Sequence, residues 1–288
     1  MRFFRRLGGA AAFLVHMLWT SIQIAGSAAI AKKGATLSAY LKLKSKHFLT
    51  KLFPGMQFRQ ETLFGHPVAF FDYFTLMCMF ETVFVYSDYF FRPATEKPFI
   101  LDCGSNIGLS VLYFKKQFPE SRVIAFEPDP ETFGYLERNV AAHGLRGVEL
   151  HNRAVFSQAG PIDFHTDPAA PGSVCMSVRG ERMPATQTAE AVTLSSFIEG
   201  EVDFLKLDVE GAEMAVLEEV ARSGKLRQIR EMAVEYHHHM VPDEDRFSEL
   251  LRLLEVEGFG YVLHDTPVRP FARGQFEPIL VYAYRKAE

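Results

Sequence analysis

The sequence predicts an α/β protein with a seven-stranded, mostly parallel sheet, helices on both faces of that sheet, and an N-terminal helical extension. Three observations lead to this prediction. Short apolar runs alternate with helical stretches from residue 99 onward, which favours parallel strands joined by right-handed crossovers. Cap signals mark the ends of several helices. A glycine-containing turn follows the first strand of the series, at the sheet edge where open α/β sheets bind ligands.

The alternation defines each element of the sheet. The predicted strands are Phe99–Asp102, Arg122–Phe126, Val148–Leu150, Phe204–Asp208, Met232–Tyr236, Tyr261–His264 and Ile279–Tyr284. The predicted helices are Ile107–Phe118, Pro130–His143, Ala212–Ser223 and Glu244–Glu257. Asp129, followed by Pro130 and an early acid, is typical of a helix start. Gly144 and Gly258 stand where glycines commonly end helices.

The chain is predicted to have three parts. Residues 1–60 form a helical, basic extension, and residues 99–288 form the α/β domain. Residues 61–98 form an aromatic-rich cap segment. Two interpretations of this segment stay open: a cap that packs on the main domain, or a lid over an acceptor pocket.

The first residues allow three interpretations. Leu7–Ala31 is a run of 25 residues without Asp, Glu, Lys or Arg, long enough to span a bilayer. The run is also rich in Gly, Ala and Ser, as a packed helix of a soluble protein can be. Ala29-Ile30-Ala31 would suit cleavage of a secretory signal. Because basic residues flank both ends of the run, the positive-inside rule does not choose an orientation.

Composition narrows the partners and the compartment. The net charge of −4 provides no global field for nucleic acid, so no nucleic-acid partner is expected. Basic residues nevertheless cluster early, at Arg2, Arg5, Arg6, Lys32, Lys33, Lys42, Lys44, Lys46 and Lys51. The odd, widely spaced cysteines Cys78, Cys103 and Cys175 do not form a disulfide framework. A cytoplasmic location, with membrane association through residues 7–31 as an option, is therefore expected.

The turn after the first strand favours one nucleotide cofactor over another. Gly104 lets a ligand approach the backbone, Gly108 lets helix and strand pack closely, and Glu127 could accept the hydroxyls of a ribose. The turn lacks the full G-x-G-x-x-G spacing of NAD sites. Asp102, at the strand end, would repel a pyrophosphate but attract the ammonium and sulfonium groups of S-adenosylmethionine. S-adenosylmethionine is therefore the predicted cofactor, and Gly108 is counted among the residues of its predicted site.

Four segments carry a family resemblance: Leu101–Gly108, Phe126–Pro128, Asn152–Val155 and Asp203–Glu213. On these segments, residues 99–240 resemble the FkbM family of class I methyltransferases. The resemblance implies a Rossmann-like fold and a hydroxyl acceptor on a sugar, glycolipid or natural product. It also implies which residues contact the cofactor. Its amino-acid end would contact Asp102, Gly104 and Asn106. Glu127 would bind the ribose, and Asn152 would lie near the adenine.

Methyl transfer requires a positioned acceptor and removal of its proton. Asp208 ends a strand beside the expected methyl position, and Lys206 lies on the same strand face, either paired with an acid or orienting acceptor or cofactor. His237, at the end of the next strand, is suited to act as a general base. Asp208, Glu235 and His237 could instead hold a divalent metal, although none is predicted, and His237–His239 could be a solvated loop.

The sequence therefore predicts an S-adenosylmethionine-dependent methyltransferase, with O-methylation of a small-molecule or lipid-linked acceptor. The predicted catalytic residues are Asp208, His237 and Lys206. The loop Thr166–Thr186 is expected to cover the acceptor. Three alternatives stay open: an NAD-dependent oxidoreductase or epimerase, a non-catalytic membrane-attached binding module, and a protein methyltransferase.

Overall fold

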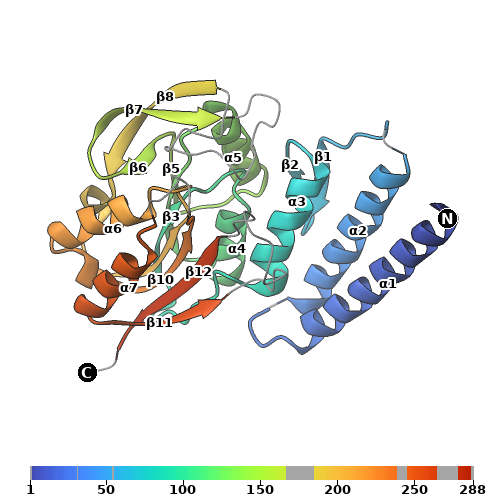
Figure 1. The fold of residues 1–288 in the computed structure, drawn as a ribbon, viewed down its shortest axis with the longest axis horizontal. Coiled ribbons are helices and arrows are strands. Elements are labelled where there is room, and N and C mark those ends of the chain that lie inside the picture. The colour runs from blue at the N-terminus through green and yellow to red at the C-terminus, as the bar shows by residue number, and fades with distance from the viewer. Residues whose placement is uncertain are drawn as a thin grey trace. The chain divides into compact units, whose positions relative to one another are not determined.

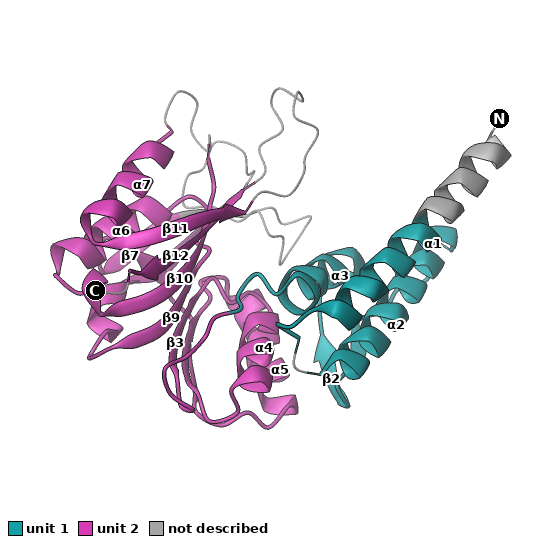
Figure 2. Cartoon of the chain, turned by 90° about the horizontal axis from the view of Figure 1, so that it is seen from below, with its two compact units in different colours: residues 1–90 teal, residues 91–288 magenta. Residues whose placement is uncertain are grey.

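The computed structural model divides into two compact units, residues 1–90 and residues 91–288 (Figure 2). The described residues are 2–30, 32–53, 55–166, 185–238, 245–264 and 278–286. The first unit is helical with one small hairpin, and the second contains the large sheet. Each unit is described by itself below.

A seven-stranded sheet with the order β11-β12-β10-β9-β3-β4-β5 forms the centre of the second unit (Figure 1). Its strands are β3 (Phe99–Cys103), β4 (Arg122–Phe126), β5 (Val148–His151), β9 (Val202–Leu207), β10 (Ile229–Tyr236), β11 (Phe259–His264) and β12 (Ile279–Arg285). Within this sheet, β12 pairs antiparallel with both of its neighbours, while the strands from β10 to β5 pair in parallel. The predicted seven-stranded, mostly parallel sheet is confirmed.

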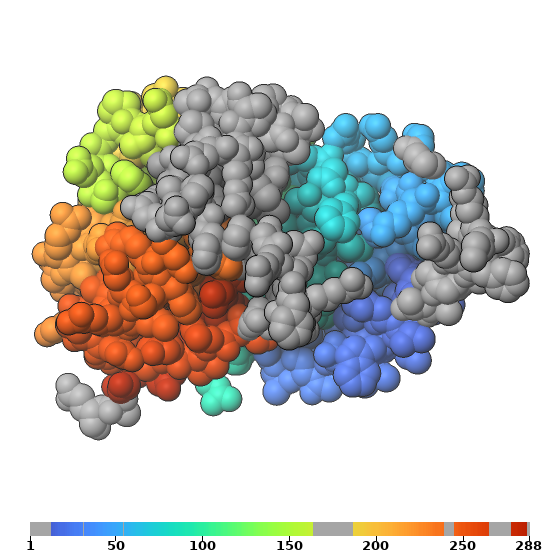
Figure 3. All heavy atoms as spheres, viewed as in Figure 1, coloured from blue at the N-terminus to red at the C-terminus, as the bar shows by residue number. Residues whose placement is uncertain are grey.

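Helices cover both faces of this sheet, as predicted (Figures 1 and 2). One face carries α4 (Leu109–Gln117) and α5 (Pro130–Ala142). The other carries α6 (Glu213–Arg222) and α7 (Phe247–Val256), which are coloured orange in Figure 3. Short 3-10 turns at 194–197 and 226–228 complete the helical elements of this unit.

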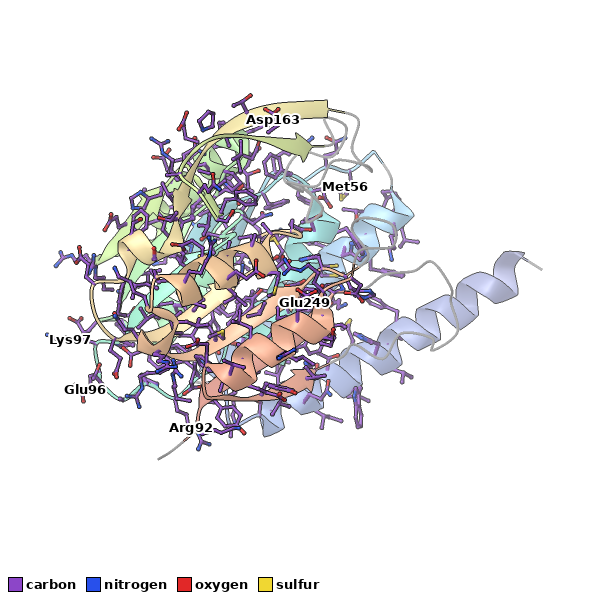
Figure 4. All side chains as sticks on the ribbon, turned by 60° about the vertical axis from the view of Figure 1, so that its left-hand side comes forward. Met56, Arg92, Glu96, Lys97, Asp163 and Glu249 are labelled. Carbon is purple, nitrogen blue, oxygen red and sulfur yellow. The ribbon has the colours of Figure 1, made fainter. Side chains whose placement is uncertain are left out.

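The side-chain alternation of β3 assigns its residues to the two helical layers. Leu101 and Cys103 are fully buried in the hydrophobic core that α6 and α7 complete. Asp102 points to the opposite face, where it meets Ser110 of α4. The segment that leads into β3 is polar, and Arg92, Glu96 and Lys97 point away from the sheet (Figure 4).

A second, three-stranded sheet in this unit was not predicted. It has the order β6-β8-β7, with β6 (Ala154–Phe156), β7 (Gly160–Thr166) and β8 (Ala185–Thr193). The predicted loop Thr166–Thr186 is wrong at its two ends, because those residues belong to β7 and β8. Residues 167–184, between them, lie outside the described part of the chain.

The first unit begins with two helices, as expected for the N-terminal extension. Its elements are α1 (Arg2–Gly26), α2 (Lys33–Leu52), the hairpin β1 (Gln60–Leu63) and β2 (His66–Ala69), α3 (Tyr73–Phe80) and a π-helical turn at Glu81–Tyr86. Rings from the aromatic-rich segment build a core within the unit: Phe80 and Phe84 stack at 5.1 Å, and Phe64 lies 5.0 Å from Phe84.

Two buried carboxylates of the first unit neutralise basic residues of α2. Glu61 lies 3.0 Å from Lys42 and 2.7 Å from Lys46, and it accepts a hydrogen bond from Tyr73. Glu81 pairs with Lys44 at 2.7 Å. Among the described residues, no helix has the length and apolar character that crossing a membrane requires.

Candidate active site

The candidate site lies between β3 and β9, where the strand order of the large sheet reverses direction. The crossover after β3 leads to β4 on one side, whereas β9 is followed by β10 on the other. The carboxyl ends of these four parallel strands lead directly into Gly104, Glu127, Asp208 and His237. Open α/β sheets bind ligands at such a switch point, because the diverging loops leave a crevice there.

Gly104 joins the ends of three strands and can only be glycine. Its φ is +85°, and a Cβ at this position would lie 1.8 Å from the carbonyl oxygen of Asp208. The backbone N–H groups of Gly104 and Ser105 both donate to the carbonyl of Phe126, at 3.0 and 2.8 Å. Glycine is therefore required here because the Asp208 carbonyl occupies the place of a side chain. The approach of a ligand to the Gly104 backbone stays a prediction.

The rest of the turn is held against the next helix. Gly108 has a φ of +89°, and a Cβ there would lie 2.6 Å from Cδ1 of Leu136 on α5. Asn139, also on α5, donates to the carbonyl of Ile107 at 2.8 Å. Asn106 adopts a φ of +47°, which directs its backbone N–H to Glu127. Gly108 thus allows close packing against helix α5, whereas the sequence predicted packing of a helix against a strand. Contact of Gly108 with the cofactor stays a prediction.

Glu127 directly follows β4 at the switch point. Its side chain accepts hydrogen bonds from the backbone N–H of Asn106 at 2.9 Å and of Asp129 at 3.0 Å. Burial raises the pKa of Glu127 to about 8, in spite of these two donors. Asn152 donates from its amide nitrogen to the carbonyls of Glu127 and Pro128, both at 2.9 Å, and so holds this loop in place. Contacts of Glu127 with ribose and of Asn152 with adenine stay predictions.

Lys206 connects the two strands at the switch point. Its Nζ lies 2.7 Å from the carbonyl oxygen of Gly104, 3.1 Å from Asp208 and 3.7 Å from Asp102. Burial alone would lower the pKa of Lys206, but the carboxylates of Asp208 and Asp102 outweigh it and raise that pKa. Lys206 is therefore a permanent cation, and its predicted pairing with an acid is present in the structure.

Asp102 lies near the end of β3, on the side that faces α4. Its carboxyl group is fully buried and accepts a hydrogen bond from Ser110 at 2.6 Å. Burial raises the pKa of Asp102, although the nearby Lys206 opposes this shift. Its other oxygen has no hydrogen bond and faces Lys206. Contact of Asp102 with the cofactor's amino-acid end stays a prediction.

His237 is held between two carboxylates. Its Nδ1 lies 3.0 Å from Glu213, and its Nε2 lies 3.3 Å from Glu210. Glu213, which is 1% exposed, also accepts the backbone N–H groups of Val209 and Gly211, so its position is fixed. Burial alone would lower the pKa of His237, but Glu213 and Glu210 outweigh burial and raise it.

Glu210 is the residue that the sequence analysis left without a role. It adopts a left-handed φ of +52°, rare for a residue with a side chain, in the turn between β9 and α6. Burial raises its pKa, and His237 opposes that shift. The only sequence signal was its position two residues after Asp208, which did not reveal the contact with His237.

The residues proposed as an alternative metal site do come together. One ligand atom from each of Asp208, Glu235 and His237 lies within 4.8 Å of the others. With Glu210 and Glu213, they place four carboxylates around one imidazole and one lysine. Of the three successive histidines, His239 lies outside the described residues, and β10 itself ends at Tyr236.

This sheet order, with acidic side chains at the switch point, is that of a class I S-adenosylmethionine-dependent methyltransferase domain. The chain belongs to the FkbM methyltransferase family: residues 102–263 match the family's domain, described as "Methyltransferase FkbM domain". S-adenosylmethionine is the cofactor of this family, as the sequence predicted. This family match rejects the alternative interpretation of the chain as an NAD-dependent oxidoreductase or epimerase.

Three curated relatives show the range of this family. "Methyltransferase 1" of Beauveria bassiana is 32% identical, over 48% of this chain and 64% of its own length. "Hexuronic acid methyltransferase AglP" of Haloferax volcanii is 31% identical, over 52% of this chain and 61% of its own. "31-O-demethyl-FK506 methyltransferase FkbM" of Streptomyces tacrolimicus is 28% identical, over 59% of this chain and 75% of its own. The chain thus spans less than two thirds of the first relative it matches.

Proposed function

We propose that this chain transfers a methyl group from S-adenosylmethionine to a hydroxyl oxygen of a sugar, a glycolipid or another natural product. The observation that carries the proposal is the His237 imidazole, fixed by Glu213 and facing Glu210 at the carboxyl ends of β9 and β10. A hydroxyl must lose a proton during methyl transfer, and this cluster can accept one. Two relatives support this substrate class by their names. One is a hexuronic acid methyltransferase, and the other is a 31-O-demethyl-FK506 methyltransferase.

The crevice fits a cationic nucleoside. Asp208 and Glu235, whose carboxylate oxygens lie within 4.8 Å of a ring nitrogen of His237, supply negative charge around the switch point. S-adenosylmethionine, when bound, supplies a methyl group on a positively charged sulfur. The carboxylates attract that charge, and they hold the acceptor side of the crevice at a negative potential, which favours loss of a hydroxyl proton to a nearby base.

The proton is accepted by His237 together with Glu210. Because the two groups face each other at 3.3 Å and each is only partly exposed, they share a proton between Nε2 and the Glu210 carboxyl group. During the reaction the acceptor hydroxyl takes the place of the Glu210 carboxyl group beside Nε2. The neutral imidazole then accepts the hydroxyl proton, while Glu210 keeps the proton that the two groups shared. Glu213 meanwhile accepts a hydrogen bond from Nδ1, which keeps the ring oriented and stabilises the imidazolium that forms.

A metal-free reaction suits this geometry better than the metal alternative. Lys206 already supplies a positive charge 3.1 Å from Asp208, one of the three candidate ligands. Both ring nitrogens of His237 already face carboxylates. We therefore expect methyl transfer to continue in the presence of a chelator such as EDTA, and a loss of activity that Mg²⁺ restores would favour the metal instead.

The proposal is tested by transfer of an isotopically labelled methyl group from S-adenosylmethionine into fractionated metabolites and lipids, followed by mass spectrometry. We expect the label on an oxygen, and we expect His237→Ala to lower the turnover number by about 10²- to 10⁴-fold without loss of S-adenosylhomocysteine binding. His264→Ala, an exposed histidine of β11, is the matched control. Label on carbon or nitrogen, unchanged turnover in His237→Ala, or cofactor binding without any transfer would contradict the proposal.

A further inference from the structure

Helix α1 packs with its less apolar side inward. Phe13 stacks on Phe48 of α2 at 5.1 Å, and Thr20 and Ile24 are buried on the same side. The opposite side carries five large apolar residues with more than half of their surface exposed: Leu14, Val15, Leu18, Trp19 and Ile22. At 100° per residue these five cover an arc of about 140°. An apolar face of this kind is costly in water and indicates a binding surface.

The sequence around this face is strongly cationic. Residues 1–60 contain ten Lys and Arg and no Asp or Glu, although the whole chain has a net charge of −4. Some of these charges are neutralised within the unit, by Glu61 and Glu81. Lys32 and Lys33, just beyond the end of α1, are exposed. Cationic residues thus remain exposed close to the end of α1.

We propose that α1 lies flat in the surface of an anionic lipid bilayer, with Leu14, Val15, Leu18, Trp19 and Ile22 inserted between the headgroups. A helix with an apolar face, a tryptophan and adjacent basic residues binds membranes in this way, and its affinity depends on both apolar area and anionic lipid. At about 1.5 Å per residue, the 25 residues of α1 extend about 38 Å along the surface. This inference does not depend on the proposed reaction.

A second copy of the chain fits this face less well. Pairing two such faces would bring two segments of the same positive charge together, and like charges repel. An anionic surface instead attracts the positive charge of this segment, the same charge that would make two copies repel each other. The observations therefore favour the bilayer over self-association.

Trp19 makes the test direct, because it is the one tryptophan of the chain. The full chain is titrated with vesicles of phosphatidylcholine and phosphatidylglycerol, and with vesicles of phosphatidylcholine alone. We expect a blue shift of the Trp19 fluorescence with anionic vesicles, quenching by brominated lipids, and weaker binding at 0.5 M salt. A lack of binding to anionic vesicles, or binding without any change at Trp19, would overturn the proposal.

A matched pair of variants separates the face from nonspecific effects. Val15 of α1 and Val256 of α7 are both 68% exposed. We expect Val15→Glu to weaken binding to anionic vesicles by about tenfold or more, and Val256→Glu to leave binding unchanged. Binding of S-adenosylhomocysteine should be the same in both variants. Equal binding of both variants to vesicles, or dimers in sedimentation with a blue-shifted Trp19 before lipid is added, would contradict the assignment.

Discussion

Single residues set the geometry of the cofactor crevice, and Gly104 has the least freedom. We expect Gly104→Ala to lower the free energy of unfolding by about 2 kcal/mol or more and to abolish S-adenosylhomocysteine binding, because its Cβ would lie 1.8 Å from the Asp208 carbonyl. Gly200→Ala is the control, since a Cβ there meets nothing within 4 Å. Denaturation and calorimetry measure both effects, and normal binding by Gly104→Ala would refute the close approach.

The ionisation of Glu127 should appear in cofactor affinity. Burial raises the pKa of this carboxyl group to about 8, so it is mainly protonated at pH 6.5 and mainly ionised at pH 9. Only the ionised form accepts hydrogen bonds from both ribose hydroxyls at full strength. Affinity for S-adenosylhomocysteine should therefore rise with pH through this range. The rise should disappear in Glu127→Gln, and an equal rise in that variant would assign the effect to another group.

Glu213 is a positioning residue, and its effect is on His237. Burial alone would lower the pKa of His237, but the Glu213 carboxylate raises it. Glu213→Gln removes the negative charge, so the pKa of His237 should fall and the acidic limb of the kcat/KM profile should move to lower pH. Glu219→Gln, a buried carboxylate of the same helix that contacts Ser195, is the control. An unmoved limb in Glu213→Gln would contradict this role.

The sequence located the residues at the sheet edge but not every contact between them. Strand ends place Gly104, Asp208 and His237 together, since parallel strands end at one edge. The contact of Glu210 with His237 depends on a left-handed backbone conformation at Glu210, which could not be predicted from the sequence. The neutralisation of Asp102 by Lys206 likewise required the register of two neighbouring strands.

Among the elements, α5 shows how a predicted cap fixes part of the site. Asp129 accepts hydrogen bonds from the backbone N–H and the hydroxyl of Thr132, both at 2.7 Å, and its own N–H holds Glu127. Asp129→Ala should lower the free energy of unfolding by about 1 kcal/mol. Circular dichroism at 222 nm during urea unfolding measures the change. Glu131→Ala, at an exposed position of the same turn, should change it by less than about 0.5 kcal/mol, and an equal loss in both would discount the cap.

Elements with large apolar side chains were predictable, and those without them were not. The predicted bounds of β4 agree with the structure, because its apolar run is buried on both faces. β8 contains mainly Ala and Thr, with one Gln, one Glu and one Val, and it pairs antiparallel with β7. Such a strand lacks the apolar signal from which the other strands were identified.

Over the whole molecule, charge divides the chain more sharply than its net value indicates. Every Asp and Glu lies beyond residue 60, and several of them surround the switch point. This separation of acidic from basic residues supports the binding of a cationic nucleoside by the second unit. It also supports the binding of an anionic surface by the first unit. The net charge of −4 hid both features, since it averages the two regions.

The most direct test of the cofactor assignment is calorimetric titration of the full chain with S-adenosylhomocysteine and, separately, with NAD. The account predicts one S-adenosylhomocysteine bound per chain and no heat from NAD, because the Asp208 and Glu235 carboxylates at the strand ends disfavour a pyrophosphate. Stoichiometric binding of NAD, with no binding of S-adenosylhomocysteine, would contradict the account.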